Sequence, residues 1–161
     1  MSEILLYPDV AKWFKIYLQA RHSHSVVKVY DSHKTNLSRL LFEKGLYRFF
    51  PEYNAFDIKI DITATIKSKR NFDLAFVECK LKPITLKDVG QIVGYSRVAR
   101  PKYAFIISPE GISGALSSLL LTYGRYDILE YALNRRIRIA KWDIIRKEID
   151  SSSFLPPGEF I

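Results

Sequence analysis

The stretch DLAFVECKLK, residues 73–82, is an apolar run that ends in closely spaced charges. Residues 74–77 are apolar and predict a buried β-strand. Because side chains alternate between the two faces of a strand, Glu78 and Lys80 should share one face while Cys79 points to the other. A carboxylate and an ammonium group are therefore expected side by side on a rigid element. Such a pair is either an ion pair at the end of a strand or half of a metal-dependent active site.

The segment AFDIKIDITATI, residues 55–66, alternates apolar and polar residues and predicts the partner strand. The alternation places Phe56, Ile58, Ile60 and Ile62 on one face, and Asp57, Lys59, Asp61 and Thr63 on the other. A tight turn centred between Lys69 and Arg70 would set Asp61 directly opposite Glu78. Their Cβ atoms would be about 5 Å apart, a distance at which two carboxylates repel each other unless a cation lies between them. We therefore expect a divalent-cation site, and Mg²⁺ fits such a pair.

The rest of the chain predicts one α/β domain, residues 1–161, in which helices flank a mixed sheet. Helices are expected over 7–21, 31–50, 85–100, 111–123 and 127–134, and further strands over 25–30, 102–108 and 135–143. We found no internal repeat and no low-complexity linker that would divide the chain. The tail from about residue 151 is rich in turn-forming residues and is expected to be loose.

The composition is that of a basic globular protein. Lys and Arg outnumber Asp and Glu by 25 to 17, which favours a polyanionic partner. No long uncharged apolar run or leader pattern is present, so we expect a cytoplasmic protein that is not inserted in a membrane. One cysteine excludes an internal disulfide and any all-cysteine metal site within one chain. Few Asn, Gln, Cys and Met residues favour a thermophilic source.

Asp61, followed across a hairpin by Glu78-Cys79-Lys80 and then by a helix, resembles the PD-(D/E)XK nuclease superfamily. The resemblance covers about residues 35–108 and implies a restriction-endonuclease-like αβββαβ core. It also implies that the Asp, the Glu and the backbone carbonyl of the Cys contact Mg²⁺ or Mn²⁺, and that the Lys positions the attacking water. Many members have a proline before the aspartate, where this chain has an isoleucine.

Gln91 and Tyr95 lie four residues apart in the next expected helix and share one face. They resemble the QxxxY motif of RecB-like nucleases, which implies that Gln91 supports the catalytic group and that Tyr95 lies near the substrate. Arg97 and Lys82 are the basic residues that we expect to contact nucleic acid beside it. The preceding helix lacks the early glutamate of archaeal Holliday-junction resolvases, so Glu43 is the candidate for a third acidic group.

These expectations define a metal-dependent deoxyribonuclease that hydrolyses phosphodiester bonds, with DNA as its partner. The alternative is a non-catalytic DNA-binding or assembly module on the same fold. An intact Asp, Glu and Lys set favours the enzyme, because a decayed site would have lost at least one of them. By analogy with nucleases of this size, a homodimer is also expected, since two sites would then face two strands.

Overall fold

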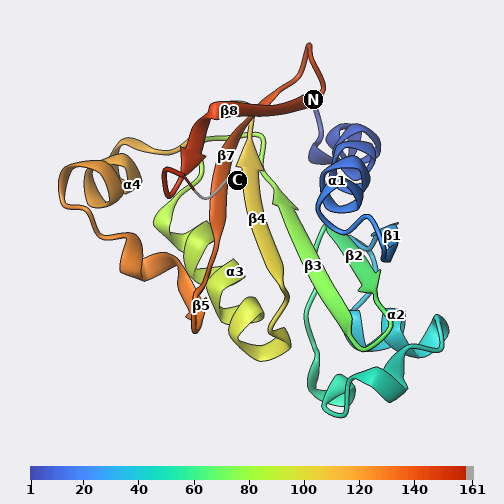
Figure 1. Cartoon of the computed structure of the whole chain (residues 1–161). Helices are drawn as coiled ribbons and strands as arrows, with labels where there is room; N and C mark the ends of the chain where they lie inside the picture. Colours follow the sequence, from blue (N-terminus) through green and yellow to red (C-terminus); the bar gives the residue numbers. More distant parts are fainter. Residues whose placement is uncertain (159–161) are drawn as a thin grey trace.

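The computed structural model describes residues 1–158, which form a six-stranded mixed sheet with helices on both faces (Figure 1). The strands run across the sheet in the order β1 (Val26–Asp31), β2 (Ile62–Lys67), β3 (Phe72–Cys79), β4 (Tyr103–Ser108), β7 (Arg138–Asp143) and β8 (Glu148–Leu155). Strands β1, β2 and β3 are antiparallel, β3, β4 and β7 are parallel, and β8 runs antiparallel to β7. The expected α/β class with a mixed sheet is confirmed.

The helices are α1 (Tyr7–Arg21), α2 (Leu37–Glu43), α3 (Leu86–Ala99) and α4 (Gly114–Ser117), which continues as a π-helical turn over Ser118–Thr122. Short 3-10 turns cover Glu3–Leu6, Tyr47–Phe49, Tyr53–Ala55 and Tyr126–Leu129, and a small second sheet pairs β5 (Glu130–Ala132) with β6 (Arg135–Arg136). No helix within residues 1–158 is long and apolar enough to cross a membrane.

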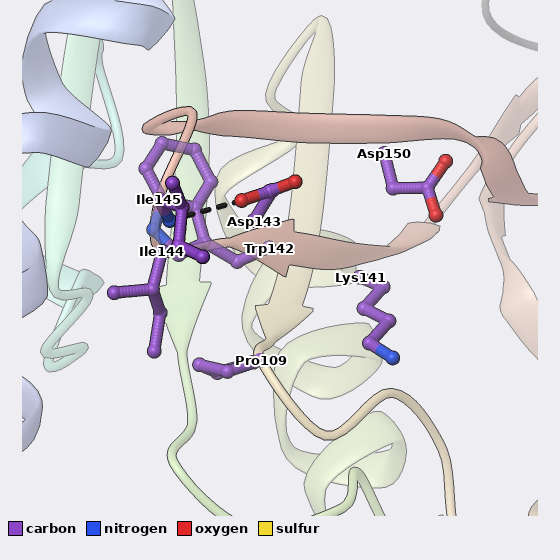
Figure 2. A pocket seen from close by; sticks show the side chains of 7 residues that line it. All are labelled: Pro109, Lys141, Trp142, Asp143, Ile144, Ile145 and Asp150. Carbon is purple, nitrogen blue, oxygen red and sulfur yellow. Dashed lines mark hydrogen bonds between the residues drawn. The ribbon is translucent and has the colours of Figure 1, made fainter.

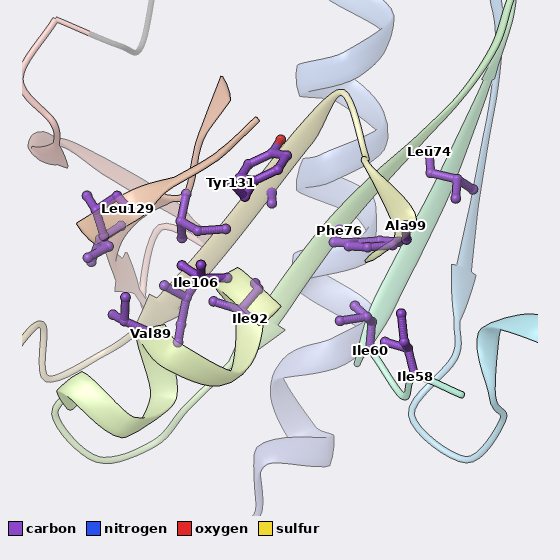
Figure 3. Close-up of a cluster of buried hydrophobic side chains, with 14 of the residues drawn as sticks. Ile58, Ile60, Leu74, Phe76, Val89, Ile92, Ala99, Ile106, Leu129 and Tyr131 are labelled. Carbon is purple, nitrogen blue, oxygen red and sulfur yellow. The ribbon is translucent and has the colours of Figure 1, made fainter. Parts of the chain in front are cut away.

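Two hydrophobic cores lie on opposite faces of the sheet, because β3 sends alternate side chains to each. Leu74 and Phe76 join the core under α2, α3 and α4, part of which is drawn in Figure 3. Ala75, Val77 and Cys79 join the core under α1. Because β3 is buried on both faces until Glu78, the charged residues at its end are held by a rigid strand.

Helix α3 begins immediately after the charged end of β3, at the capping box that its sequence specifies. The Asp88 backbone N–H donates to the Thr85 hydroxyl, and the Asp88 carboxylate accepts from the Thr85 backbone N–H at 2.9 Å. The two bonds satisfy donors that a helix start would otherwise leave unpaired. This cap fixes where α3 starts relative to Lys80.

The expectation that residues 55–66 form one alternating strand is wrong in its first half. Strand β2 begins only at Ile62, after a bend at Asp61. Ile58 and Ile60 are buried with α3 on one side of the sheet, whereas Ile62 is buried with α1 on the other. The bend therefore reverses the alternation, and the reversal lets apolar residues on both sides of Asp61 remain buried.

Other boundaries also differ from expectation. The helix expected over 31–50 is confined to α2, because residues 26–31 pair with β2 and 3-10 turns follow α2. The helix expected over 127–134 is also not formed, because the 3-10 turn ends at Leu129 and residues 130–132 form β5. Tyr131 of β5 is buried in the core under α2, α3 and α4.

Two further corrections concern the ends of the expected domain core. Residues 151–155, which were expected to be part of a loose tail, form the end of β8, and Phe154 is buried in the core under α1. The expected tail also includes residues 159–161, which lie outside the described residues. The first strand of the antiparallel set is β1, which follows α1 and precedes residue 35, and α2 is inserted between β1 and β2.

Candidate functional site

The hairpin register brings Asp61 and Glu78 together as the sequence predicts. Ile62 is the partner of Val77 in the β2–β3 ladder, so the next residues outward are Asp61 and Glu78. The Asp61 backbone N–H donates to the Glu78 carboxylate at 3.4 Å. The two acidic residues therefore lie together at the carboxyl end of β3, beside the start of β2.

Contacts from three other parts of the chain fix the position of Asp61. The Tyr7 hydroxyl of α1 donates to Oδ1, and the Cys79 backbone N–H donates to Oδ2, both at 2.8 Å. Ser32, which follows β1, holds the bend: its N–H donates to the Asp61 carbonyl at 2.9 Å and its hydroxyl to the Ile60 carbonyl at 2.6 Å. The Asp61 carboxylate is thus oriented by bonds that leave it little rotational freedom.

Glu78 and Lys80 share one face of the strand end, as alternation requires, and form an ion pair of 3.4 Å. The side chains are 13% and 22% exposed, so the pair is largely shielded from water. Burial, followed by the charge of Asp61, raises the pKa of Glu78 to about 7, although Lys80 and the Asp61 N–H act in the opposite direction. One ammonium group therefore does not fully compensate two neighbouring carboxylates, and a further cation would stabilise the charged pair.

The electrostatic surroundings of Lys80 reveal an acidic residue that the sequence reasoning missed. Burial would lower the Lys80 pKa, but the carboxylates of Glu78, Glu3 and Asp88 raise it overall. Burial and Asp61 raise the pKa of the Tyr7 hydroxyl, and Glu3 contributes there as well. Glu3 precedes α1 and carries no motif signal, because its proximity to the site depends on how α1 packs on the sheet.

Glu43, the expected third acidic group, lies elsewhere. It accepts a hydrogen bond from Arg39 at 2.7 Å on the exposed surface of α2. Within residues 1–158 no described contact joins Glu43 to the Asp61–Glu78 pair. The buried residues of α2 are its leucines, and the Glu43 carboxylate is on the solvent side, so its role as a third acidic group stays a prediction, whereas Glu3 acts on Lys80.

Gln91 and Tyr95 share a face of α3, and the Gln91 side-chain amide donates to the Tyr95 hydroxyl at 3.0 Å. No described hydrogen bond within residues 1–158 links Gln91 to Lys80 or to either carboxylate. The charge of Asp88, one turn earlier, does act on Lys80. Gln91 lies one turn after Asp88 on α3, and its expected role in supporting the catalytic group stays a prediction.

The two expected basic contacts are placed differently. Lys82 is exposed two residues after Lys80, and its backbone carbonyl accepts from the Ser108 hydroxyl at 2.8 Å. Arg97 is exposed about 13 Å farther along α3 than Asp88, where it lines a shallow cavity together with Asp127. Both residues stay predictions as contacts to nucleic acid.

The donor set fits a hard divalent cation. Mg²⁺ is commonly held by one or two carboxylates, with waters and a phosphate completing its octahedron. Each carboxylate oxygen has two lone pairs, so the bonds from Tyr7 and Cys79 leave Asp61 with capacity to bind a cation. No group of three or more His, Cys, Asp or Glu side chains suited to a metal occurs within residues 1–158. The Cys79 carbonyl stays a prediction as a ligand.

A cavity of about 500 Å³ lies between Pro109 and the β7–β8 hairpin (Figure 2). Its walls include Lys141, Asp143 and Asp150, together with Ile145 at the exposed hairpin tip. None of the candidate site residues lines it. The paired carboxylates therefore lie outside the lining of this cavity and remain the functional candidate.

Comparison of the chain with protein-family models, with curated proteins and with solved structures found no match.

The pKa of Glu78 leads to a prediction about stability in metal-free buffer. A carboxyl whose folded-state pKa is raised from 4.5 to about 7 gives stability that is present below pH 4.5 and is lost as the pH rises through 7. Relative to Glu78→Gln, the wild-type Tm should fall on the order of 5 °C between pH 5 and pH 8 with EDTA present. Thermal unfolding of both proteins across this range measures it. If Tm changes with pH in the same way for both proteins, the pKa of Glu78 is not raised in the folded protein.

Proposed function

We propose that this protein is a divalent-metal-dependent nuclease that hydrolyses phosphodiester bonds in DNA. The observation that carries the proposal is the largely buried cluster of Asp61, Glu78 and Lys80 at the end of β3. Two carboxylates form a cation-binding pair, and an ammonium group beside them can contact a phosphate or a water. Bound Mg²⁺ or Mn²⁺ would supply polarisation of the phosphate and a bound water of lowered pKa.

Each residue of the cluster has a distinct task in this proposal. Asp61 and Glu78 would hold the cation, and Tyr7 and the Cys79 N–H would keep the Asp61 carboxylate in the required orientation. Lys80 would orient the attacking water or balance charge on the phosphate, since its raised pKa keeps it an ammonium at neutral pH. The excess of Lys and Arg over Asp and Glu supports a polyanionic substrate.

The order of elements supports the finer fold proposal. Helix α1, antiparallel strands β1–β3, helix α3 and strand β4 parallel to β3 occur in this order along the chain, with α2 and two 3-10 turns inserted between β1 and β2. Apart from that insertion, the order matches the αβββαβ order expected of a restriction-endonuclease-like core, counted from Tyr7. Asp61 immediately precedes its second strand, and Glu78 and Lys80 lie at the end of its third strand, close to the positions that the resemblance to PD-(D/E)XK nucleases implies.

A non-catalytic DNA-binding module on the same fold is the second candidate. The observation in its favour is the ion pair of Lys80 with Glu78, which partly balances the buried charge without any metal. In such a module the cluster would serve stability, and the basic surface alone would bind DNA.

Cleavage of a DNA panel distinguishes the two candidates. Linear duplex, single-stranded and branched DNAs are incubated with the protein in Mg²⁺, in Mn²⁺ and in EDTA, and the products are separated on denaturing gels. A nuclease should cut at least one substrate with either metal and none in EDTA. If every DNA is bound but none is cut with either metal, the nuclease proposal fails and the binding module replaces it.

A further inference from the structure

A groove of about 300 Å³ runs between the edge strand β1 and the segment that follows α2. It is lined by Val26, Lys28, Tyr30, Lys44, Leu46, Phe49, Thr65, Lys67 and Phe72. The lining combines apolar and aromatic side chains with three lysines. Figure 1 shows α2 beside the turn between β2 and β3, which is the end of β3 opposite to the carboxylates. We call this feature the aromatic–lysine groove.

Flat aromatic surfaces are available in the groove. The rings of Phe49 and Phe72 are stacked, with centroids 4.7 Å apart and planes only 10° from parallel. Phe49 is 46% exposed, so one side of this stack faces solvent. The Lys44 ammonium lies 5.3 Å from the centre of the Tyr30 ring. An exposed ring at the end of a stack can accept another flat ring.

The charged side chains that line the groove are all lysines. Lys28, Lys44 and Lys67 line it, and no acidic residue appears among the described residues of its walls. Lys69 and Arg70 are exposed in the turn that follows Lys67. Five cationic side chains around aromatic surfaces complement a ligand that has both flat rings and negative charge. Single-stranded nucleic acid is such a ligand, because its phosphates bind cations while its bases stack on aromatic side chains.

The register of the sheet places the groove on the same face as the candidate site. Alternate residues from Phe72 to Glu78 share one face of β3, and the two lie about 20 Å apart along the strand. Tyr30 is paired with Thr63 at the near end of the groove. Thr63 lies two residues, or about 7 Å, from Asp61. The Tyr30 end is therefore the end of the groove nearer to the carboxylates.

We propose that the aromatic–lysine groove binds unpaired bases of single-stranded DNA and so selects substrates with a free strand. The proposal rests on the proposed nuclease function for its direction toward the carboxylates, but the binding itself does not. A duplex hides its base faces in its own stack, so a Phe49 ring can stack only on an unpaired base. A cavity of about 300 Å³ is at the small end for ligand pockets, which suits a base but not a double helix.

The test measures binding in EDTA, where metal-dependent cleavage does not interfere. Fluorescence anisotropy is recorded with a labelled oligo-dT strand and with a blunt duplex of equal length. Phe49→Ala should weaken binding of the single strand roughly 10-fold, and Phe49→Leu should do the same because it keeps apolar bulk but lacks a π face. Duplex binding should change less than twofold. Tyr123→Ala is the matched control, since Tyr123 is 73% exposed beyond α4 and outside the groove.

Lys67→Gln provides a second measurement that does not alter the aromatic stack. It should weaken single-strand binding and reduce the slope of log affinity against log salt by about 1, the signature of one lost phosphate contact. Melting curves establish that each variant is folded. Unchanged single-strand binding in the Phe49 and Lys67 variants overturns the proposal. Equal losses for strand and duplex, or competition by a poly-glutamate peptide as effective as that by DNA, overturn it as well.

The two proposals fail separately in these experiments. If the protein cuts no DNA but its single-strand binding depends on Phe49, the groove proposal is supported and the nuclease proposal fails. If the protein cuts DNA and the Phe49 variants bind and cut as the wild type does, the nuclease proposal is supported and the groove proposal fails.

Discussion

Glu78→Gln is expected to lower the rate of metal-dependent DNA cleavage by roughly 10²–10⁴-fold. The substitution keeps the shape of the side chain but removes the negative charge that would hold the cation beside Asp61. Binding of DNA in EDTA should be unchanged or tighter, because a carboxylate is removed from the neighbourhood of the phosphate. Single-turnover cleavage and anisotropy on the same DNA measure the two effects. Glu148→Gln on the exposed part of β8 is the matched control.

Lys80→Ala should lower cleavage over the same range while weakening DNA binding only slightly, since one phosphate contact among several is lost. Lys87→Ala, an exposed lysine on the first turn of α3, controls for the loss of a positive charge in this region. Cleavage by both Glu78→Gln and Lys80→Ala at wild-type rates would remove the cluster from the mechanism, even if the protein is a nuclease.

Asp61→Ala is expected to combine a loss of cleavage with a loss of stability. It deprives the Tyr7 hydroxyl and the Cys79 N–H of their shared acceptor, and unpaired buried donors cost about 1–3 kcal/mol each. The Tm should therefore fall by roughly 5–15 °C for a chain of this length. Differential scanning calorimetry at neutral pH measures the change in Tm, and the cleavage assay measures the loss of activity.

Two further substitutions separate the roles of Asp61. Tyr7→Phe removes one of the two donors that orient the Asp61 carboxylate but leaves the bond from the Cys79 N–H, so cleavage should fall far less than in Asp61→Ala, with a Tm loss of a few degrees. Asp61→Asn retains an acceptor oxygen but lacks the charge, so it should keep more of the Tm than Asp61→Ala while losing cleavage to a similar extent. A stable Asp61→Ala protein with full cleavage activity would contradict both roles.

Local patterns predicted the elements that surround the catalytic candidates. The register of the β2–β3 hairpin follows from its short turn, because a tight connection leaves few ways to pair two strands. The start of α3 follows from Thr85 and Asp88, whose side chains bond to the backbone within one turn. The pairing of Asp61 with Glu78 could thus be predicted from residues less than twenty positions apart.

Long-range packing decided what those patterns missed. The bend at Asp61 depends on Ser32, which bonds to the backbone on either side of it from the end of β1. Alternation alone predicted a continuous strand there, because apolar residues before and after the bend have the same period although they enter different cores. Residues 151–155 at the end of β8 were expected to be part of a loose tail because the segment is rich in turn-forming residues, whereas Phe154 is buried in the core under α1.

The sequence by itself determined the α/β class, the hairpin that pairs Asp61 with Glu78, the ion pair with Lys80 and the shared face of Gln91 and Tyr95. Each of these depends on the period of a strand or helix and on contacts between near neighbours in the chain. The tertiary structure alone decided the contribution of α1, which brings Tyr7 to Asp61 across 54 residues and Glu3 to the surroundings of Lys80. It also decided the aromatic–lysine groove, because its walls come from β1, the segment after α2, and the β2–β3 hairpin. The reason is physical: a side chain's direction is set by its own backbone, but its neighbours across the fold are set by how whole elements bury their apolar faces.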